Sequence, residues 1–217
     1  MALLENLCVV DHPILRDALT LLRDRRTESA TFRRKLHEIT RLLTYEATRD
    51  LDMRTVEIET PLAKTQSETV SEKPVVVSIM RAGNGMLDAV LAVMPFAAAG
   101  HIGIYRDKFI NNTVEYYLKL PEDARGRRVY LVDPLLGTGD TAVACIDRLK
   151  QYEVGAITFI CVLCSKPGLE KLFHFHPDVK VYTVAIEPEI NELGYLVPGL
   201  GDVGDRLYNV VSSAGGA

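Results

Sequence analysis

The sequence predicts an α/β fold in which helices cover both faces of a mostly parallel, twisted sheet. Short apolar runs alternate along the chain with segments of helical periodicity, which is the pattern of repeated strand–helix units. The runs are continuously apolar, as expected of strands that are covered on both sides. At 217 residues the chain is long enough to bury a sizeable core without disulfides or metals. We therefore expect a single domain over residues 1–217.

The elements follow in order from these patterns. Helical spacing predicts His12–Arg23 and Phe32–Ala47, which make an N-terminal helical part over about residues 1–50, and then Met86–Val93, Thr141–Tyr152 and Gly168–Phe175. Buried strands are predicted at Pro74–Met80, Val129–Val132, Ile157–Leu163 and Val179–Ile186. From about Glu187 onward, repeated prolines and glycines interrupt the pattern and predict irregular backbone.

Composition excludes several classes of protein. Charged residues make up 25% of the chain and its net charge is −4, so a basic footprint for nucleic acid is missing. The sequence has no apolar stretch long enough to cross a bilayer, and its N-terminus lacks the basic region and cleavage site of a signal peptide. We expect a cytoplasmic protein with no nucleic-acid and no membrane partner.

The turn that follows the strand Val129–Val132 is the strongest functional signal. Gly137 and Gly139 permit a tight turn and close approach of a ligand, while Thr138 and Thr141 place hydroxyls beside the free N–H groups of a helix start. Such a nest binds phosphate. Asp133 ends the strand, where open α/β sheets bind ligands, and its carboxylate suits ribose hydroxyls. An ordinary strand–turn–helix junction with Asp140 as the N-cap is the competing interpretation.

Two other pairs resemble metal sites. Cys161 and Cys164 have the CxxC spacing, but an odd offset on one strand points side chains to opposite faces, so we expect buried free thiols. His174 and His176 lack a clear third ligand, and a polar helix end is their expected position.

Four further segments extend the signal over nearly the whole chain: Met80–Met86, Gly103–Asp107, Val114–Pro121 and the tail Asn191–Arg206. With the Gly/Thr turn, they resemble the uracil phosphoribosyltransferases, a branch of the type I phosphoribosyltransferase family. The resemblance implies the type I fold, with a C-terminal hood over about residues 187–210 that covers the base site.

The reaction implied by the resemblance moves the 5-phosphoribosyl group of 5-phosphoribosyl 1-diphosphate (PRPP) to N1 of uracil and yields UMP and diphosphate. The leaving diphosphate is anionic and the anomeric carbon becomes cation-like, so cations and carboxylates must flank the sugar. The resemblance makes Asp202 and Arg106 the catalytic residues, although Arg81 and Arg106 taken alone could be surface arginines. Its PRPP site comprises Arg81, Arg106, Asp133, Pro134, Leu135, Leu136, Gly137, Thr138, Gly139, Asp140, Thr141 and Asp202.

Uracil offers an acceptor, a donor and a second acceptor along one edge, and backbone groups can oppose them. By resemblance, Leu196, Gly201, Asp202 and Val203 supply this readout, with Tyr195 and Pro198 as hood scaffold. The expected cofactor is Mg²⁺, held through PRPP oxygens and waters with Asp202 acting through water rather than by a side-chain cage.

The chain departs from the family pattern in two places. Asn84 replaces a usual Leu, and Gly137, Asp140 and Thr141 stand where Ala, Gly and Ser are usual. A carboxylate at position 140 would repel a phosphate bound at the same amides, so we expect Asp140 to point outward as a cap.

Two alternative functions remain open from the sequence. A regulatory protein that senses PRPP or UMP and binds RNA could use the same fold. An orotate or purine phosphoribosyltransferase fits less well, because Arg206 is the hood's sole candidate partner for the orotate carboxylate. The resemblance also implies a homodimer or larger assembly, with Asn111–Pro121 as a candidate arm, and makes GTP a candidate effector.

Overall fold

The structure is a computed structural model and describes residues 5–107 and 112–210. Within these ranges it confirms the predicted class: a seven-stranded sheet has the order β1-β11-β9-β7-β4-β5-β6, and all pairs are parallel except β5 with β6. The strands are β1 (Leu7–Val9), β4 (Val75–Met80), β5 (Ala98–Asp107), β6 (Asn112–Lys119), β7 (Val129–Val132), β9 (Ile157–Ile160) and β11 (Lys180–Thr183).

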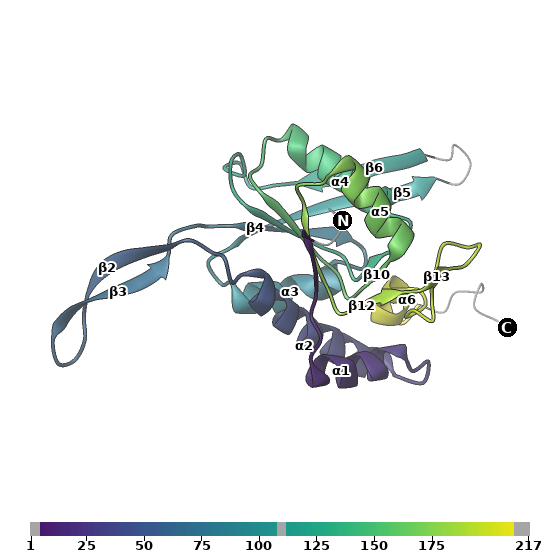
Figure 1. Ribbon diagram of the computed structural model, residues 1–217, viewed down its shortest axis with the longest axis horizontal. Coiled ribbons are helices and arrows are strands. Elements are labelled where there is room, and N and C mark those ends of the chain that lie inside the picture. The colour runs from purple at the N-terminus through teal and green to yellow at the C-terminus, as the bar shows by residue number, and fades with distance from the viewer. Residues whose placement is uncertain (1–4, 108–111, 211–217) are drawn as a thin grey trace.

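Helices cover both faces of this sheet (Figure 1). One face packs against α1 (Pro13–Arg23), α2 (Ser29–Ala47) and α3 (Asn84–Val93), and the other against α4 (Asp140–Gln151) and α5 (Lys166–Phe175). The predicted helices are confirmed, with starts that lie one to three residues from the predicted ones. Pro13 and Pro167 stand in the first turns of α1 and α5, where their missing N–H groups are not needed.

Three neighbouring strands break at the same level, which the sequence did not predict. β7, β9 and β11 are followed by β8 (Leu135–Leu136), β10 (Leu163–Ser165) and β12 (Ala185–Glu187), which form a second parallel sheet in the order β12-β10-β8. The predicted strands Ile157–Leu163 and Val179–Ile186 are therefore each two strands. Pro134 cannot donate to a ladder, but its carbonyl accepts from the N–H groups of Val162 (2.9 Å) and Leu163 (3.1 Å). The break opens the sheet next to Asp133.

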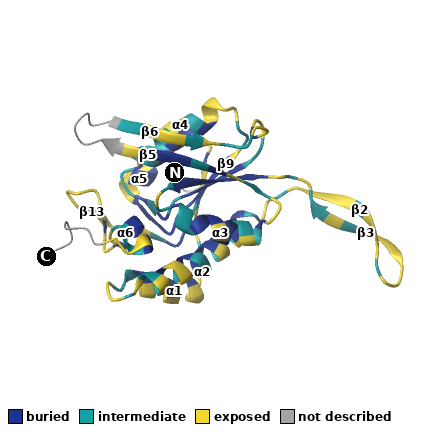
Figure 2. Cartoon of the chain, turned by 180° about the vertical axis from the view of Figure 1, so that it is seen from behind, coloured by how far each residue is buried: buried dark blue, intermediate teal, exposed yellow. Residues whose placement is uncertain are grey.

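A hairpin of β2 (Met53–Glu59) and β3 (Lys64–Val70) projects from the body (Figure 1) and was also not predicted. Most of its residues are exposed on both faces, as Figure 2 shows. The segment that we expected as a candidate arm, Asn111–Pro121, lies largely in β6, which pairs with β5 at the edge of the main sheet; residue 111 lies outside the described ranges.

The C-terminal part begins after β12 with the two-stranded ribbon β13 (Glu189–Ile190) and β14 (Leu196–Val197), followed by α6 (Val203–Tyr208). These elements lie beside α1 and α2, past the carboxyl ends of the central strands (Figure 1). Among the described residues, no helix combines the length and apolarity that a bilayer span requires.

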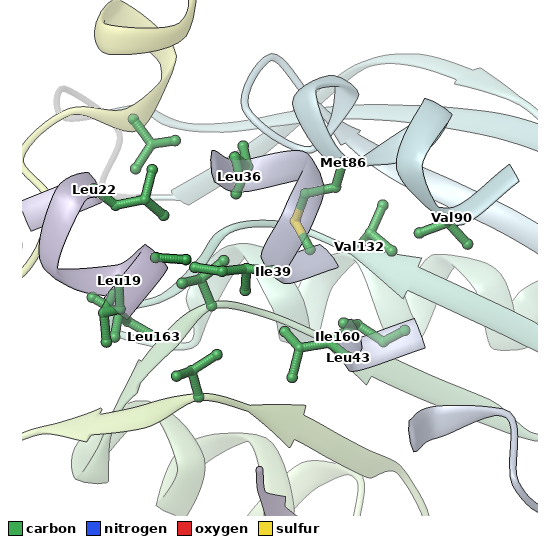
Figure 3. Close-up of a cluster of buried hydrophobic side chains, with 14 of the residues drawn as sticks. Leu19, Leu22, Leu36, Ile39, Leu43, Met86, Val90, Val132, Ile160 and Leu163 are labelled. Atoms are coloured by element: carbon green, nitrogen blue, oxygen red, sulfur yellow. The ribbon is translucent and has the colours of Figure 1, made fainter. Parts of the chain in front are cut away.

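The larger core lies between the sheet and the N-terminal helices (Figure 3). Leu36, Ile39 and Leu43 of α2 are fully buried and face Val132, Ile160 and Met86 in this cluster. This packing ties the N-terminal helical part to the strands whose ends carry the polar loops.

We predict that Ile39→Ala lowers the free energy of unfolding by about 2–5 kcal/mol, because it leaves a cavity in this core. Leu62→Ala is the control, since Leu62 is 96% exposed at the hairpin tip and should change stability by less than about 0.5 kcal/mol. Urea unfolding followed by circular dichroism measures both; equal effects would contradict the packing described.

Candidate active site

A cavity of about 290 Å³ lies between the turn that follows β7 and the C-terminal segment. From the sheet side it is lined by Ala82, Asp133, Leu135, Leu136, Gly137, Thr138, Gly139, Thr141 and Ala142. From the C-terminal side it is lined by Gly194, Tyr195, Leu196, Gly201, Asp202, Val203 and Gly204. The structure thus brings the Gly/Thr turn and the tail together, although they are distant in sequence.

The Gly/Thr turn ends in a left-handed glycine. Gly139 has φ +85° and is the N-cap of α4, so the first N–H groups of that helix open toward the cavity. α5 supports the turn from behind: the hydroxyl of Ser165 donates to the carbonyl of Gly137 (2.7 Å) and accepts from the N–H of Gly168 (2.9 Å). The turn is therefore a fixed row of donors, as an anion site requires.

Asp133 lies at the floor of the cavity, where β7 breaks. Burial raises the pKa of its carboxyl from 3.8 to about 8, and within the described residues no neighbouring cation opposes this rise. Hydroxyl donors or a cation bound in the cavity would stabilise the ionised carboxylate of Asp133.

Asp140 is not the N-cap, so the predicted capping role is wrong. It is the first residue of α4, and its carboxylate accepts from the hydroxyl of Thr138 (2.8 Å) and pairs with Lys171 of α5. The side chain does not line the cavity, unlike its neighbours Gly139 and Thr141. Gly139 stands at the cap position instead, and its positive φ is a conformation that glycine adopts without strain.

Arg81 lies at the edge of the cavity rather than in its lining. Its guanidinium pairs with Asp205 of α6 at 3.3 Å and is more than half exposed. Its carbonyl accepts from the hydroxyl of Tyr208 (3.1 Å) and from the N–H of Asn84 (3.2 Å). The backbone of Arg106 lies in β5, and its side chain falls outside what the structure describes.

Four residues proposed for the base lie together in the C-terminal wall: Leu196, Gly201, Asp202 and Val203. Asp202 caps α6, because its Oδ1 accepts from the N–H of Asp205 at 2.9 Å. Gly201 has φ +69°, a conformation that favours glycine and turns the backbone polar groups at this point. Tyr195, expected as hood scaffold, also lines the cavity. Gly194 and Gly204 line it too but were not proposed; the turn chemistry of the tail was the signal that could have found them.

The C-terminal wall is anchored to the N-terminal helices by partly buried arginines. Arg206 donates to the carbonyls of Leu22, Leu200 (3.1 Å) and Asp24 (2.8 Å) and stacks on Phe32 at 4.2 Å. Desolvation lowers the pKa of its guanidinium. Because these partners hold Arg206 and the cavity lining within the described residues contains no cation, an orotate carboxylate has no counter-charge there.

A second anchor joins β12 to α1. Glu187 is fully buried, pairs with Arg23 and accepts from the N–H of Gly199 at 3.2 Å. Arg23 also donates to the carbonyl of Gly199 at 3.2 Å. The irregular backbone of the wall is therefore held by charged groups whose hydrogen bonds are satisfied.

The described residues contain no group of three His, Cys, Asp or Glu side chains that could hold a metal. Cys161 and Cys164 are free thiols, as predicted. The prediction that they point to opposite faces of one strand is wrong. The chain breaks after β9, and the buried thiols of Cys161 and Cys164 lie in hydrogen-bond contact; burial raises the pKa of Cys161 well above its usual value.

Comparison with known proteins identifies the family. The sequence profile of the uracil phosphoribosyltransferases matches residues 9–210. The chain belongs to the uracil phosphoribosyltransferase family. Relatives of that name include one from Variovorax paradoxus, 47% identical over 94% of this chain and 99% of its own length. Another, from Legionella pneumophila, is 48% identical over 92% of this chain and 94% of its own length.

Solved structures agree on the fold. A protein of Aquifex aeolicus matches with a TM-score of 0.89 and 29% identity, over 95% of this chain and 99% of that one. An adenine phosphoribosyltransferase from Leishmania donovani, only 11% identical, matches with a TM-score of 0.58 over 87% of each chain, which indicates the fold alone. The type I phosphoribosyltransferase fold expected from the sequence is thus confirmed.

The activity of the family is a pentosyl transfer: PRPP and uracil give UMP and diphosphate. The predicted enzyme class is confirmed, and neither the family match nor the names of the relatives favour the RNA-binding alternative.

We predict that Asp133→Asn stabilises the ligand-free protein, and more so at pH 8 than at pH 5. The folded-state pKa of about 8 exceeds the unfolded value of 3.8, so the native state loses stability as pH rises between these values. The gain should grow by on the order of a few kcal/mol at most across this window. Thermal unfolding at both pH values measures it, with the exposed Asp17→Asn as control. A gain that is independent of pH would show that Asp133 ionises freely.

Proposed function

We propose that PRPP and uracil meet in the cavity between the Gly/Thr turn and the C-terminal wall, with the turn holding the ribose 5-phosphate and the wall holding the base. The observation that carries this proposal is that one cavity is lined from both sides by a helix N-terminus and by a turned, polar backbone. The amides of Gly137 to Thr141, with the hydroxyls of Thr138 and Thr141, bind the phosphate. Leu135 and Leu136 line the approach, and Pro134 fixes their direction.

On this proposal, Asp133 accepts hydrogen bonds from the ribose hydroxyls and stabilises positive charge at the anomeric carbon as the bond to diphosphate breaks. Arg81 and Arg106 bind the diphosphate, on which charge grows as it leaves. Arg81 then exchanges its pairing with Asp205 for the incoming phosphates. Asp140 keeps its carboxylate on Lys171, which moderates its repulsion of the phosphate.

The donor set fits Mg²⁺ held largely by the substrate. Asp133 and Asp202 are carboxylates of the cavity lining, and burial without a counter-charge raises the pKa of Asp133. Mg²⁺ commonly takes one or two carboxylates with substrate phosphates and waters. When bound, the ion would neutralise charge on diphosphate, with Asp202 acting through water.

The backbone of Gly201, Asp202 and Val203, with Leu196, reads the edge of uracil. Cytosine reverses two hydrogen-bonding positions, which leaves polar groups of the cavity unpaired at about 1–3 kcal/mol each. Tyr195 lines the same cavity and lies where a ring can cover the base.

We predict that uracil is converted to its nucleotide at least a hundredfold more efficiently than cytosine, about 3 kcal/mol. Purified protein is incubated with PRPP, Mg²⁺ and uracil, cytosine, orotate or hypoxanthine, and kcat/KM is measured for each base. Comparable values for uracil and cytosine would refute the backbone readout, and turnover of orotate would mean that a cation reaches the cavity.

We also propose a cytoplasmic homo-oligomer that assembles through the hairpin β2–β3. An isolated two-stranded ribbon is marginally stable in water, and this one is exposed on both faces. A second copy would cover it. GTP is proposed as an effector. A groove of about 1180 Å³ between α1, α2, α3 and α6 is lined by Arg33, Arg34, Lys35, His37 and Arg41, together with Glu38 and Asp88. Lys35 pairs with Glu38 at 2.7 Å and Arg33 donates to the carbonyl of Leu207 at 2.6 Å, so Arg34 and Arg41 are the proposed partners of a polyphosphate.

We predict that the intact chain sediments as a dimer or larger species, and that replacing residues 53–70 by a short Gly/Ser loop gives a smaller one with an unchanged far-ultraviolet signature of the core. Sedimentation velocity measures both, with Asp17→Asn, an exposed position on α1 outside the ribbon, as the control. An assembly of unchanged size would assign the contact to another surface.

A further inference from the structure

Three polar side chains from three elements form a hydrogen-bonded row behind the Arg81 turn. The hydroxyl of Ser78, fully buried on β4, lies 2.7 Å from Oδ1 of Asn84, the first residue of α3. The same hydroxyl lies 2.9 Å from Nδ1 of His101 on β5, which is the register partner of Ser78. None of the three lines the cavity of the site.

The number of available hydrogens determines which group donates in each hydrogen bond of the row. The hydroxyl of Ser78 has one hydrogen, which it donates to Oδ1 of Asn84. His101 must therefore donate its Nδ1–H to the oxygen of Ser78. Each of the three facing atoms then has a partner, which matters because an unpaired polar group at a buried site costs about 1–3 kcal/mol.

The row bears on Arg81 through Asn84. The side chain of Asn84 holds Ser78, while its backbone N–H donates to the carbonyl of Arg81 at 3.2 Å. Close packing fixes the same turn further along: the N–H of Gly83 donates to Ile79 (2.8 Å), and a Cβ at Gly83 would lie 2.4 Å from the carbonyl of Val132. The start of α3 therefore cannot shift without moving the carbonyl of Arg81.

We propose that Ser78, Asn84 and His101 are positioning residues for PRPP: they hold the start of α3 so that Arg81 points at the diphosphate. This rests on the role proposed above for Arg81. A leucine at position 84 could fill space but could not accept a hydrogen bond from Ser78, so the contact depends on the amide of Asn84. None of the three side chains lines the cavity where the wall is proposed to read the base, so we expect a larger effect on PRPP than on uracil.

The test removes one hydrogen-bonding group of the row at a time and compares the effect on PRPP with the effect on uracil. Ser78→Ala removes the central hydroxyl and His101→Leu removes the donor, whereas His101→Asn keeps an N–H near the position of Nδ1 and is the matched control. We expect the first two variants to raise the KM for PRPP and the Kd for PRPP in calorimetry about five- to twentyfold. The KM for uracil should stay within twofold, and His101→Asn should stay within about threefold of the parent protein.

A double variant separates this proposal from the role of Arg81. If the row acts through Arg81, Ser78→Ala should change PRPP binding little once Arg81→Ala is present, so the two effects are not additive. If PRPP binding is lost in Arg81→Ala but not in Ser78→Ala or His101→Leu, the positioning role of the row is wrong, while the proposed role of Arg81 in binding PRPP stands. Additive effects, equal rises in both KM values, or an Arg81→Ala variant with unchanged PRPP binding also overturn the positioning role of the row.

Discussion

The site depends on the in-register parallel pairing of β4 with β7. Val75 lies opposite Val129 and Ser78 opposite Val132, so both strands end on the same edge of the sheet. Parallel strands deliver their carboxyl ends together, and each end leads into a turn and a helix start. The turn after β4 carries Arg81, and the segment after β7 carries Asp133 and the Gly/Thr turn. A slip of one residue would turn the inner side chains of β7 to the other face.

The cavity is closed by a wall that has little regular structure. Its backbone stays in place because Arg206 and Glu187 bind carbonyl and N–H groups of the wall and of α1. Charged groups are costly to bury unless they are paired. Here they are paired with backbone groups of the wall, and these pairings fix the conformation of the wall. The N-terminal helices are thus structural support for the C-terminal wall of the cavity, although none of their residues lines the cavity.

Features set by local patterns could be predicted from the sequence. Apolar runs indicated the central strands, helical periodicity the helices, and glycines with threonines the turn after β7. The broken strands could not be predicted, because the break depends on the carbonyl of Pro134 meeting Val162 and Leu163 of a neighbouring strand. The projecting hairpin was missed because its strands bury neither face.

Within the site, sequence patterns and the family resemblance located most of the residues that line the cavity, but not the partner of each side chain. Asp140 points away from the cavity, as expected, but Gly139 is the cap and Lys171 of the next helix binds Asp140. Arg81 was expected at the diphosphate, and its guanidinium lies on Asp205. Both outcomes depend on groups distant in sequence. The binding roles themselves stay predictions.

The four thiols differ in burial, so their rates of chemical modification would report on opening of the fold. Cys8 is exposed on β1, whereas Cys145, Cys161 and Cys164 are buried. A thiol-directed probe added to the folded chain would modify Cys8, and slowly, because desolvation and Glu46 raise its pKa. The three remaining thiols become reactive when the sheet opens. The rate of their modification would follow the opening of the strands beneath Asp133 without any engineered label.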